Sequence, residues 1–367
     1  MADTATLLEI LLAPYRERSN AVISDLWDAW CAEHPESRYP SSRTMRRHVR
    51  LLRAGKRYRY AIALLGYEGL TGRAAEDSVA CATAWLELYH LYTLFLDDIM
   101  DEDARRRTMP SAWIANARLF PGRSNGRTAR LFASQAYRYG ASQAILDALR
   151  LRSLAERAIQ RSGLDVAVRE QLLQELTETD LVVSDGQGLD LDLEWARRIP
   201  EADYVAMSER KTGRLYLASA ATAAIAAGAK PEGRRALESY AGHFAVAFQD
   251  RDDLLGSGVV KSRIGGSAAS DVAQGKRTRL YAIAWERLPP KLRVRFLRSY
   301  GRGARTTARD LDLVRSLLRE HALGVMVARI ADHVSAAIRA LDSVSVVDDR
   351  AKKVLVALAR DQETRDR

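Results

Sequence analysis

The chain has 367 residues, of which 47% are hydrophobic and 28% charged, so it can bury the core of one large domain or of two ordinary ones. This composition excludes an intrinsically disordered chain. Lysine and arginine outnumber aspartate and glutamate by 57 to 47, which gives a net charge of +10, and only eight of the 57 basic residues are lysine. The excess of arginine favours bidentate contacts with phosphate or carboxylate groups.

Cysteine usage and hydropathy indicate a soluble, cytoplasmic protein. Cys31 and Cys81 have no metal-binding or disulfide spacing, which fits a reducing compartment and predicts no zinc site. Residues 1–19 contain acidic side chains and only a short apolar run, unlike a signal peptide. The longest uncharged stretch, residues 215–229, falls short of the ~20 residues that a membrane-spanning helix needs.

Hydrophobic periodicity predicts an all-α fold, because apolar residues recur at three- and four-residue spacing and no strand-like alternation is found. No interdomain linker and no internal repeat interrupts the pattern, so we expect one large domain over residues 46–367 after a helical extension over residues 1–45. The predicted helices are 5–32, 42–67, 74–101, 127–163, 165–184, 201–229, 231–256, 269–286, 290–300, 305–320, 322–342 and 347–361.

The first charged motif along the chain is Gly55-Lys56-Arg57-Tyr58-Arg59, which opens an apolar helix and places Lys56 and Arg59 on one face. The next helix, residues 80–101, is apolar nearly all round until it ends in carboxylates, which is typical of a helix buried at the centre of a bundle. His90 lies two turns, roughly 10 Å, before the first of these carboxylates. A lone histidine at such a position is more often a hydrogen-bonded core residue than a ligand.

Three carboxylates end this helix. Asp97 and Asp101 are four residues apart, so they lie one turn above each other on one face, with Asp98 beside them. Their charges repel at the end of an apolar core unless cations or protons neutralise them. Hard divalent cations such as Mg²⁺ would do so and would complete their coordination with water and substrate phosphate oxygens. The arginine run 105–107 follows directly.

A second apolar helix ends in the same way. Gln249 and Asp252 share a face there, and Asp253 is adjacent. Further cations and hydroxyls come from Lys211-Thr212-Gly213 before this helix and from Gly275-Lys276-Arg277-Thr278 after it.

Either acidic cluster alone is equally consistent with a helix end in solvent that pairs with arginines. An EF-hand is excluded, because neither cluster has the alternating ligand loop with a central glycine and a closing glutamate. Two such clusters after apolar helices, together with the basic motifs, favour a metal-lined pocket for diphosphates at the mouth of an apolar cavity.

These ordered motifs resemble those of the trans-isoprenyl diphosphate synthase (polyprenyl synthetase) family over about residues 50 to 280. The resemblance implies the isoprenoid synthase fold, a single large helical bundle around a central cavity. DDIMD at 97–101 resembles the first aspartate-rich motif of that family, and FQDRDD at 248–253 resembles the second. GKRYR, the arginine pair at 106–107, GQGLDL at 186–191, KTG at 211–213 and DVAQGKRT at 271–278 fall where the family has similar motifs.

The resemblance also implies roles for individual residues. Asp97, Asp101 and Asp252 would hold three Mg²⁺ ions that bridge an allylic diphosphate (dimethylallyl, geranyl or farnesyl), and Asp98 and Asp253 would belong to the same catalytic clusters. The reaction would be a head-to-tail condensation, in which metal ions and cations stabilise the departing pyrophosphate. Arg106, Lys211, Thr212, Gln249 and Lys276 would assist the allylic diphosphate, and Lys56, Arg59, His90 and Arg107 would hold isopentenyl diphosphate.

Some positions depart from the family pattern. Gly256 stands where many members have a third aspartate. Gly266 stands where they have a lysine, for which Lys261 or Arg263 could substitute. These changes suggest a divergent member, but the isopentenyl-binding set is complete, which favours condensation.

Product length depends in this family on the fifth residue before the first aspartate, which floors the chain pocket and is Tyr92 here, with Tyr89 one turn further back. A bulky floor and a first motif without insertion imply a short product, geranylgeranyl (C20) or farnesyl (C15) diphosphate, with C20 favoured. Five residues place Tyr92 about 140° around an ideal helix from Asp97, so geometry adds little to this. Both tyrosines are also consistent with ordinary core packing.

Three other functions remain open. A terpene cyclase of the same fold would use the acidic clusters but would not need the isopentenyl-binding set. A weakly active subunit of a heteromeric synthase is suggested by Gly256 and Gly266. The basic segment 38–59 could contact nucleic acid, but no base-reading motif accompanies it, so no nucleic-acid partner is expected. By resemblance, the protein is expected to be a homodimer.

Overall fold

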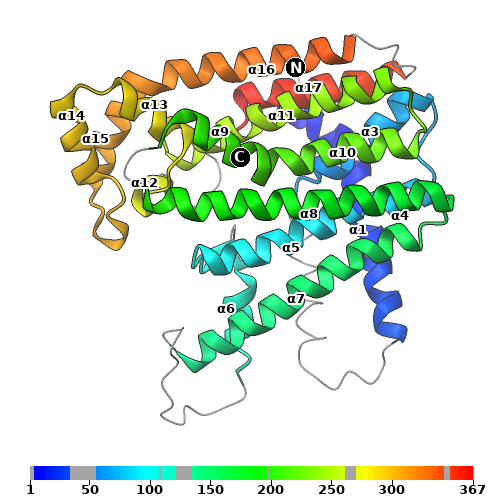
Figure 1. Ribbon diagram of the computed structural model, residues 1–367. Coiled ribbons are helices and arrows are strands. Elements are labelled where there is room, and N and C mark those ends of the chain that lie inside the picture. The colour runs from blue at the N-terminus through cyan, green and yellow to red at the C-terminus, as the bar shows by residue number, and fades with distance from the viewer. Residues whose placement is uncertain are drawn as a thin grey trace. The chain divides into compact units, whose positions relative to one another are not determined.

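The predicted all-α fold is confirmed over the residues that the computed structural model describes (Figure 1). Strands among them are limited to β1 (Arg105–Arg106) and β2 (Met109–Pro110), which pair antiparallel. The expected boundary between residues 45 and 46 lies outside the described residues and stays a prediction. The described ranges are 4–33, 55–106, 109–120, 134–196, 199–260, 270–342 and 348–366.

The helices alternate with short turns along the chain. Their bounds are α1 (Thr4–Glu33), α3 (Tyr58–Thr71), α4 (Asp77–Thr83), α5 (Trp85–Met100), α6 (Ala112–Ala117), α7 (Gln135–Gln160), α8 (Val166–Trp195), α9 (Glu201–Ser208), the π-helical turn η1 (Glu209–Gly213), α10 (Arg214–Ala226), α11 (Pro231–Gly256), α12 (Ser270–Gln274), α13 (Arg279–Arg287), α14 (Pro290–Ser299), the 3₁₀ turn η2 (Gly303–Arg305), α15 (Ala308–Leu318), the π-helical turn η3 (Arg319–Leu323), α16 (Gly324–Asp342) and α17 (Asp349–Thr364).

Two compact units interleave along the chain. The small unit comprises Leu12–Leu64 and Ala74–Leu173, and the large unit comprises Met1–Leu11, Leu65–Arg73 and Gln174–Arg367. The motifs divide between them: GKRYR and DDIMD belong to the small unit, whereas KTG, FQDRDD and DVAQGKRT belong to the large unit.

In the small unit α7 packs against both α5 and α6. Gly140 permits the close approach of α7 to α6, because a Cβ atom there would lie 2.2 Å from the carbonyl oxygen of Trp113. Trp85 and Tyr89 of α5 are fully buried and meet edge to face, with ring centroids 6.1 Å apart. The apolar face of α5 is therefore the core of this unit, as its sequence predicts.

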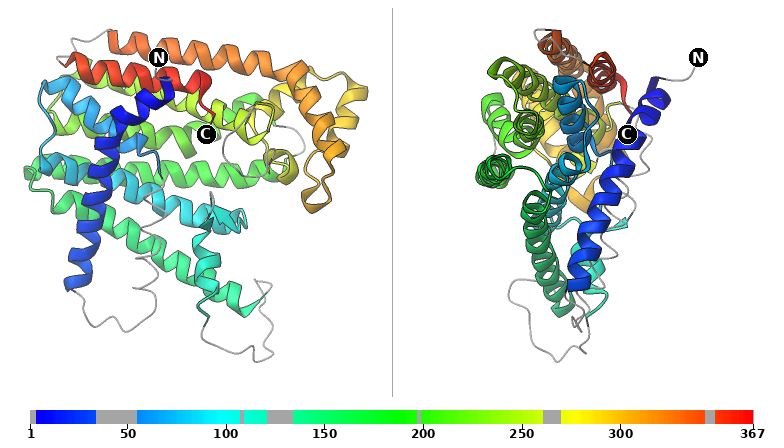
Figure 2. Two further views of the ribbon diagram at one scale, coloured as in Figure 1. Left: turned by 180° about the vertical axis from the view of Figure 1, so that it is seen from behind. Right: turned by 90° about the vertical axis from the view of Figure 1, so that its right-hand side faces the viewer.

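In the large unit α11 packs against α10 and α16, and α16 runs beside α17, as both views of Figure 2 show. The rings of Tyr216 and Phe244 are buried and meet at 5.1 Å between centroids. The buried hydroxyl of Tyr240 donates a 2.8 Å hydrogen bond to the carbonyl oxygen of Leu355 in α17. Aromatic packing and this bond fix α17 on α11.

One helix predicted as continuous, residues 269–286, is broken into α12 and α13. Gly275 adopts φ +81°, and a Cβ atom there would lie 2.8 Å from the Cα of Gly301, so the position requires glycine. Thr278 then caps α13, since its hydroxyl accepts a hydrogen bond from the amide of Tyr281 at 3.2 Å. The prediction of one helix was wrong, because hydrophobic periodicity does not reveal a single residue with left-handed backbone angles such as Gly275.

Other boundaries differ for local reasons. The short helix α6 was not predicted, and α8 continues to Trp195, beyond the predicted end at residue 184. The predicted helix 201–229 contains the π-helical turn η1 between α9 and α10. A Cβ atom at Gly186 of α8 would lie 2.4 Å from the amide nitrogen of Lys211, so this glycine lets η1 approach α8 closely.

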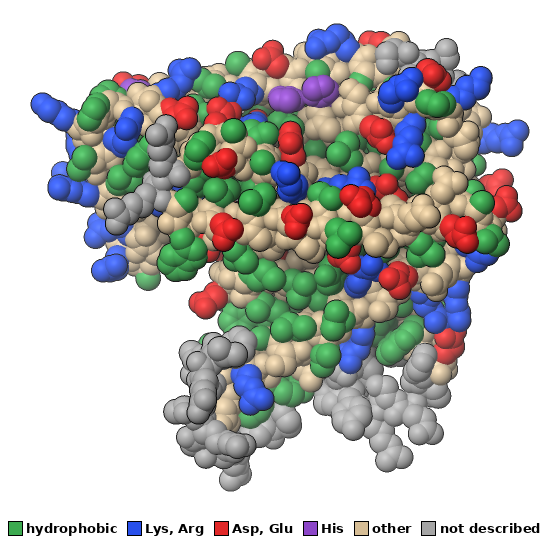
Figure 3. Space-filling model, in the orientation of Figure 1, with side chains coloured by type: hydrophobic (Ala, Val, Ile, Leu, Met, Phe, Trp, Pro, Cys, Tyr) green, Lys and Arg blue, Asp and Glu red, His purple; other side chains and the backbone are tan. Residues whose placement is uncertain are grey.

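The stretch Asp77–Met100 is long and apolar enough to cross a membrane by length and composition, but 67% of its apolar window is buried inside the protein. It is therefore the core segment that the sequence predicts, with a break at Ala84 between α4 and α5. Basic and acidic side chains are interspersed on the face drawn in Figure 3. The net charge of +10 does not form a single basic patch on that face.

Candidate active site

The first predicted carboxylate cluster ends α5 in the small unit, with Asp97 and Asp98 in the last turn and Asp101 at the C-cap. The guanidinium of Arg106 binds two of these carboxylates at once. Its Nη2 lies 2.9 Å from Asp97 Oδ2, and its Nε lies 2.6 Å from Asp98 Oδ1. The pairing of β1 with β2 holds Arg106 at this place. The repulsion expected between neighbouring aspartates is thus relieved by an arginine of the same unit.

Asp97 and Asp98 differ in their access to solvent, since their side chains are 18% and 2% exposed. Burial raises the pKa of Asp98 to about 6, and the nearby charge of Arg106 opposes that shift. Asp101 is half-buried like Asp97. Asp97 and Asp101 can therefore meet a cation from solvent, whereas Asp98 is placed to hold Arg106.

The cations of GKRYR lie at the start of α3. Lys56 and Arg59, both predicted to bind a diphosphate, are half-buried. Arg57 between them is buried, and it binds Glu87 of α5 at 3.2 Å and Asn20 of α1 at 3.0 Å. Arg57 has φ +58°, a strained value for a residue other than glycine, so these two contacts hold the turn against its preference. Arg57 therefore fixes the turn from which the two predicted ligands extend.

The residues predicted to bind isopentenyl diphosphate and to limit chain length follow along α5. His90 and Tyr92 are half-buried, and Tyr89 is fully buried. The rings of Tyr89 and Tyr92 meet with their centroids 5.3 Å apart. Tyr89 is thus a core residue, and Tyr92 lies at the edge of the same aromatic cluster.

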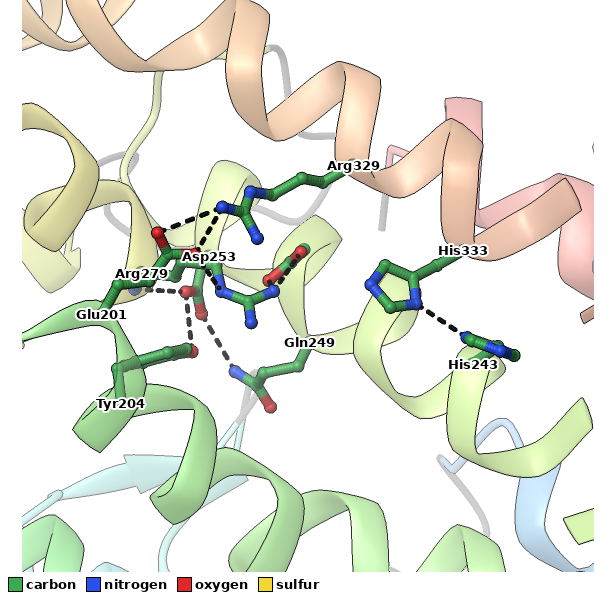
Figure 4. A network of polar contacts seen from close by, with 9 residues as sticks. Glu201, Tyr204, His243, Gln249, Asp253, Arg279, Arg329 and His333 are labelled. Atoms are coloured by element: carbon green, nitrogen blue, oxygen red, sulfur yellow. Dashed lines mark hydrogen bonds and ion pairs between the residues drawn. The ribbon is translucent and has the colours of Figure 1, made fainter. Parts of the chain in front are cut away.

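The second cluster ends α11 in the large unit, and its most buried carboxylate is Asp250, which the sequence did not single out. Arg279 Nη1 lies 2.9 and 2.8 Å from the two carboxylate oxygens of Asp250. Glu201 pairs with Arg279 at 3.5 Å and with Arg329 at 2.8 Å. Burial raises the pKa of Asp250 to about 6 although Arg279 opposes the shift. This chain of ion pairs ties α9, α11, α13 and α16 together (Figure 4).

Asp253, predicted as catalytic, is buried and accepts three hydrogen bonds (Figure 4). The donors are the Tyr204 hydroxyl at 2.7 Å, Gln249 Nε2 at 3.0 Å and the backbone amide of Arg279 at 2.9 Å. Burial raises the pKa of Asp253 to about 8, and the charge of Asp250 adds to that shift. Fixed donors of the large unit therefore satisfy this carboxylate, and a catalytic role for it stays a prediction.

Lys211 and Thr212 lie on the π-helical turn η1, a backbone form often found at functional sites. The hydroxyl of Thr212 donates to Gln249 Oε1 at 3.0 Å, so two predicted site residues are joined. Lys211 Nζ lies 2.5 Å from Asp190 Oδ2 of α8. The structure thus brings together Thr212, Gln249 and Asp253 in one hydrogen-bonded chain.

Asp252, the predicted metal ligand of α11, is the carboxylate of its cluster that reaches solvent, with a side chain 42% exposed. Its Oδ1 lies 2.5 Å from Arg365 Nη2 at the carboxy-terminal end of α17. No motif in the sequence singles out Arg365.

Gly256 leaves room for the carboxylate of Asp271. A Cβ atom at Gly256 would lie 1.9 Å from Asp271 Oδ2, so a third aspartate in this motif would require the Asp271 side chain to move. Lys276 is half-buried, and its carbonyl oxygen accepts a hydrogen bond from the Tyr300 hydroxyl at 2.5 Å. Contact between Lys276 and a diphosphate stays a prediction.

The chemistry of each cluster, taken by itself, suits magnesium. Mg²⁺ is held by one or two carboxylates and otherwise by water and phosphate oxygens; the small unit supplies Asp97 and Asp101, and the large unit supplies Asp252. That these three residues bind the ion stays a prediction. Within the described part of the chain, no group of three histidine, cysteine, aspartate or glutamate side chains could hold a metal ion by itself. Arg107, Gly266, Lys261 and Arg263 lie outside the described residues.

Sequence reasoning missed five residues that hold the two clusters or the GKRYR turn. Arg57 and Asp250 lie inside recognised motifs and Arg279 follows one directly, so a charged residue in or next to a motif was a usable signal. Tyr204 and Arg365 carried no such signal, because their partners Asp253 and Asp252 are 49 and 113 residues away.

Comparison with known proteins extends over most of the chain. Residues 44–317 match the polyprenyl synthetase family. The geranylgeranyl diphosphate synthase of Methanosarcina mazei is 28% identical over 281 residues, which are 77% of this chain and 78% of that protein. The short chain isoprenyl diphosphate synthase of Methanothermobacter thermautotrophicus is 31% identical over 249 residues, 68% of this chain and 69% of that protein.

The fold is similar to that of a solved enzyme. The crystal structure of geranylgeranyl pyrophosphate synthase from Corynebacterium glutamicum, complexed with isoprenyl diphosphate and magnesium, superposes with a TM-score of 0.84 and 26% identity. The match covers 96% of this chain and 99% of that one.

Proposed function

We propose that this chain, which belongs to the polyprenyl synthetase family and is a trans-prenyltransferase making short prenyl diphosphates, condenses isopentenyl diphosphate with an allylic diphosphate to give mainly geranylgeranyl diphosphate. One observation carries the proposal. Arg106 binds Asp97 and Asp98 together at the end of the buried helix α5, so a fixed cation lies beside one carboxylate that reaches solvent, that of Asp97. Such a pair suits a metal-bound diphosphate, which needs both acidic ligands and basic partners.

The residues divide into two groups in this proposal. Asp97, Asp101 and Asp252 would hold three Mg²⁺ ions, which when bound would supply Lewis-acid stabilisation of the negative charge on a diphosphate. Arg106, Lys211, Thr212, Gln249 and Lys276 hold the allylic diphosphate, and Lys56, Arg59, His90 and Arg107 hold isopentenyl diphosphate.

The basic residues act on the leaving group. The bond between the allylic carbon and the diphosphate oxygen breaks, and pyrophosphate leaves with the electron pair. Cationic side chains fixed beforehand around those oxygens stabilise the developing negative charge without reorganising. The double bond of isopentenyl diphosphate then forms the new carbon–carbon bond with the allylic cation. A proton lost to pyrophosphate restores the double bond, so no side chain has to act as general base.

The aromatic cluster on α5 supports a short product. Tyr89 is fully buried and its ring contacts that of Tyr92, so the two rings together form a bulky group on this helix. We propose that Tyr92 stops the growing chain at twenty carbons and that Tyr89 supports it from behind.

We further propose a cytoplasmic homodimer. One face of α7 exposes Ile145, Leu146 and Leu149, which lie within about 100° of each other around the helix, with exposed fractions between 41% and 54%. Apolar side chains recurring on one helix face are typical of a surface that a second copy covers in a two-fold interface. Light scattering tests this: the protein should have twice the chain mass, and Leu149→Glu should halve it.

One assay tests the reaction and its alternatives. The purified protein is incubated with Mg²⁺, isopentenyl diphosphate and each of dimethylallyl, geranyl and farnesyl diphosphate, and the dephosphorylated alcohols are sized. We expect a C20 alcohol from the protein alone. Cyclic products without use of isopentenyl diphosphate would instead indicate a terpene cyclase, and no turnover without a second protein would indicate a subunit of a heteromeric synthase.

A further inference from the structure

We propose that Arg365 is a positioning residue for Asp252, so that the carboxy-terminal end of α17 belongs to the diphosphate site. The inference rests on the proposed function, because it takes Asp252 as a magnesium ligand. It concerns a residue outside the stretch 44–317 that matches the family.

Arg365 is held from several sides. Its Nη2 lies 2.5 Å from Asp252 Oδ1 and donates to the carbonyl oxygen of Phe248 at 2.9 Å. Its Nε donates to Gln362 Oε1 at 2.6 Å, and the guanidinium lies 4.4 Å above the centre of the Phe248 ring. These contacts leave the guanidinium little freedom.

The backbone of Arg365 is fixed independently of Asp252. Arg251, which precedes Asp252 on α11, donates through Nε to the carbonyl oxygen of Arg365 at 2.7 Å. Gln362 is fully buried one turn earlier and donates to the Leu358 carbonyl oxygen at 2.9 Å. Residues of α11 and α17 therefore hold the guanidinium in place independently of Asp252, so it is preorganised to bind that carboxylate.

The exposures of the two partners show which way the support acts. The side chain of Arg365 is 4% exposed, whereas that of Asp252 is 42% exposed. Arg365 thus binds one carboxylate oxygen from the inner side and leaves the outer side of Asp252 to solvent, from which a hydrated cation arrives.

The neighbouring aspartates of α11, Asp250 and Asp253, cannot serve as the solvent-accessible metal ligand. Asp250 is enclosed by Arg279, and Asp253 by Tyr204, Gln249 and Arg279. Both are buried. Asp252 is the member of the three that combines access to solvent with a rigid partner. Partners of this kind, which hydrogen-bond a ligating carboxylate, orient it, and their loss typically costs about 10- to 100-fold in metal affinity or activity.

The test compares three full-length variants. Arg365→Ala removes the support, and Arg365→Lys keeps the charge but loses the planar donor set that reaches Asp252, Phe248 and Gln362 together. Arg360→Ala removes an exposed arginine from the same helix as a matched control. Calorimetry measures the Mg²⁺ dependence of binding to inorganic pyrophosphate, steady-state assays separate kcat from KM, and thermal unfolding checks the fold.

We expect Arg365→Ala to weaken the apparent affinity for Mg²⁺ by about 10- to 100-fold, Arg365→Lys to recover part of that loss, and Arg360→Ala to match the wild type. A folded Arg365→Ala variant with unchanged or tighter Mg²⁺ binding would overturn the inference, because Arg365 would then be a structural residue or a competitor of the ion. If Arg365→Ala does not fold, the same criterion applies to Arg365→Lys. Wild-type protein that neither binds pyrophosphate with Mg²⁺ nor forms product would overturn the proposed function itself.

Discussion

The hydroxyl of Tyr204 in α9 donates a 2.7 Å hydrogen bond to the carboxylate of Asp253 near the end of α11. Both side chains are buried, and Asp253 also accepts bonds from Gln249 and from the amide of Arg279. Three donors from three helices thus converge on one carboxylate. The last turn of α11, which presents Asp252, is fixed by this convergence and not by α11 alone.

Tyr204→Phe should lower the free energy of unfolding by about 1–3 kcal/mol, because the ring is kept while a buried carboxylate loses a donor. Urea denaturation at constant pH measures this. Tyr137→Phe is the control, since Tyr137 is exposed and its ring contact with Trp113 survives. Equal free energies for the two variants would show that the bond to Asp253 contributes nothing to stability.

Arg106→Lys should reduce kcat/KM on the order of 100-fold, because lysine cannot bind Asp97 and Asp98 at once and a fixed donor to the leaving diphosphate is lost. Steady-state assays with farnesyl diphosphate measure the effect. Arg105→Lys, one residue earlier and exposed, should behave like the wild type. If both variants lose activity to the same extent, the simultaneous binding of Asp97 and Asp98 by Arg106 does not explain the loss of kcat/KM.

Asp97→Ala and Asp252→Ala should each reduce kcat on the order of 1000-fold, equivalent to about 4 kcal/mol of lost transition-state stabilisation. Chelation of Mg²⁺ should abolish wild-type turnover, and added Mg²⁺ should restore it. Glu102→Gln, which alters an exposed carboxylate directly after Asp101, is the control. Near-normal turnover in Asp97→Ala would remove Asp97 from the set of metal ligands.

Tyr92→Ala should lengthen the product beyond twenty carbons, because it removes the half-buried ring that leans on Tyr89. Chromatography of the dephosphorylated alcohols measures the chain length. Tyr92→Phe keeps the ring and should keep the wild-type product. An unchanged product from Tyr92→Ala would mean that another residue floors the chain pocket.

The contribution of His333 to folding stability should fall as the pH drops from about 6.5 to about 4. Burial, His243 and the charges of Arg279 and Arg329 lower the pKa of His333 to about 4, with Asp332 opposing them. The rings of His333 and His243 meet at 2.9 Å between Nδ1 atoms (Figure 4).

The sign follows from proton binding. Between the folded pKa of about 4 and the ordinary value of about 6.5, unfolding lets His333 bind an additional proton, so its contribution to the free energy of unfolding decreases as the pH falls through this window. Asp98, Asp250 and Asp253 have raised pKa values and act in the opposite direction, so the test is the difference between variant and wild type. In thermal unfolding, the stability of His333→Gln relative to the wild type should rise as the pH falls from about 6.5 to about 4. The same slope in His333→Gln and the wild type would contradict this.

The fold class, the family and the two acidic helix ends can be predicted from the amino-acid sequence alone. The apolar residues of α5 and α11 predict core helices, because a buried helix face requires apolar residues at regular spacing, which is visible in the sequence. The sequence also points to Asp97 and Asp252, because carboxylates at the end of an apolar helix need a partner. These features are local along the chain.

The partner of each carboxylate depends on how the helices pack and becomes visible in the three-dimensional structure. Arg106 for Asp98, Arg279 for Asp250 and Arg365 for Asp252 come from separate strands and helices, at separations of 8, 29 and 113 residues. Helix packing also decides that Asp98 and Asp253 are buried while Asp97 and Asp252 reach solvent. A sequence motif does not distinguish between adjacent aspartates. On a helix, however, adjacent side chains point about 100° apart, so packing against other helices gives each aspartate a different environment.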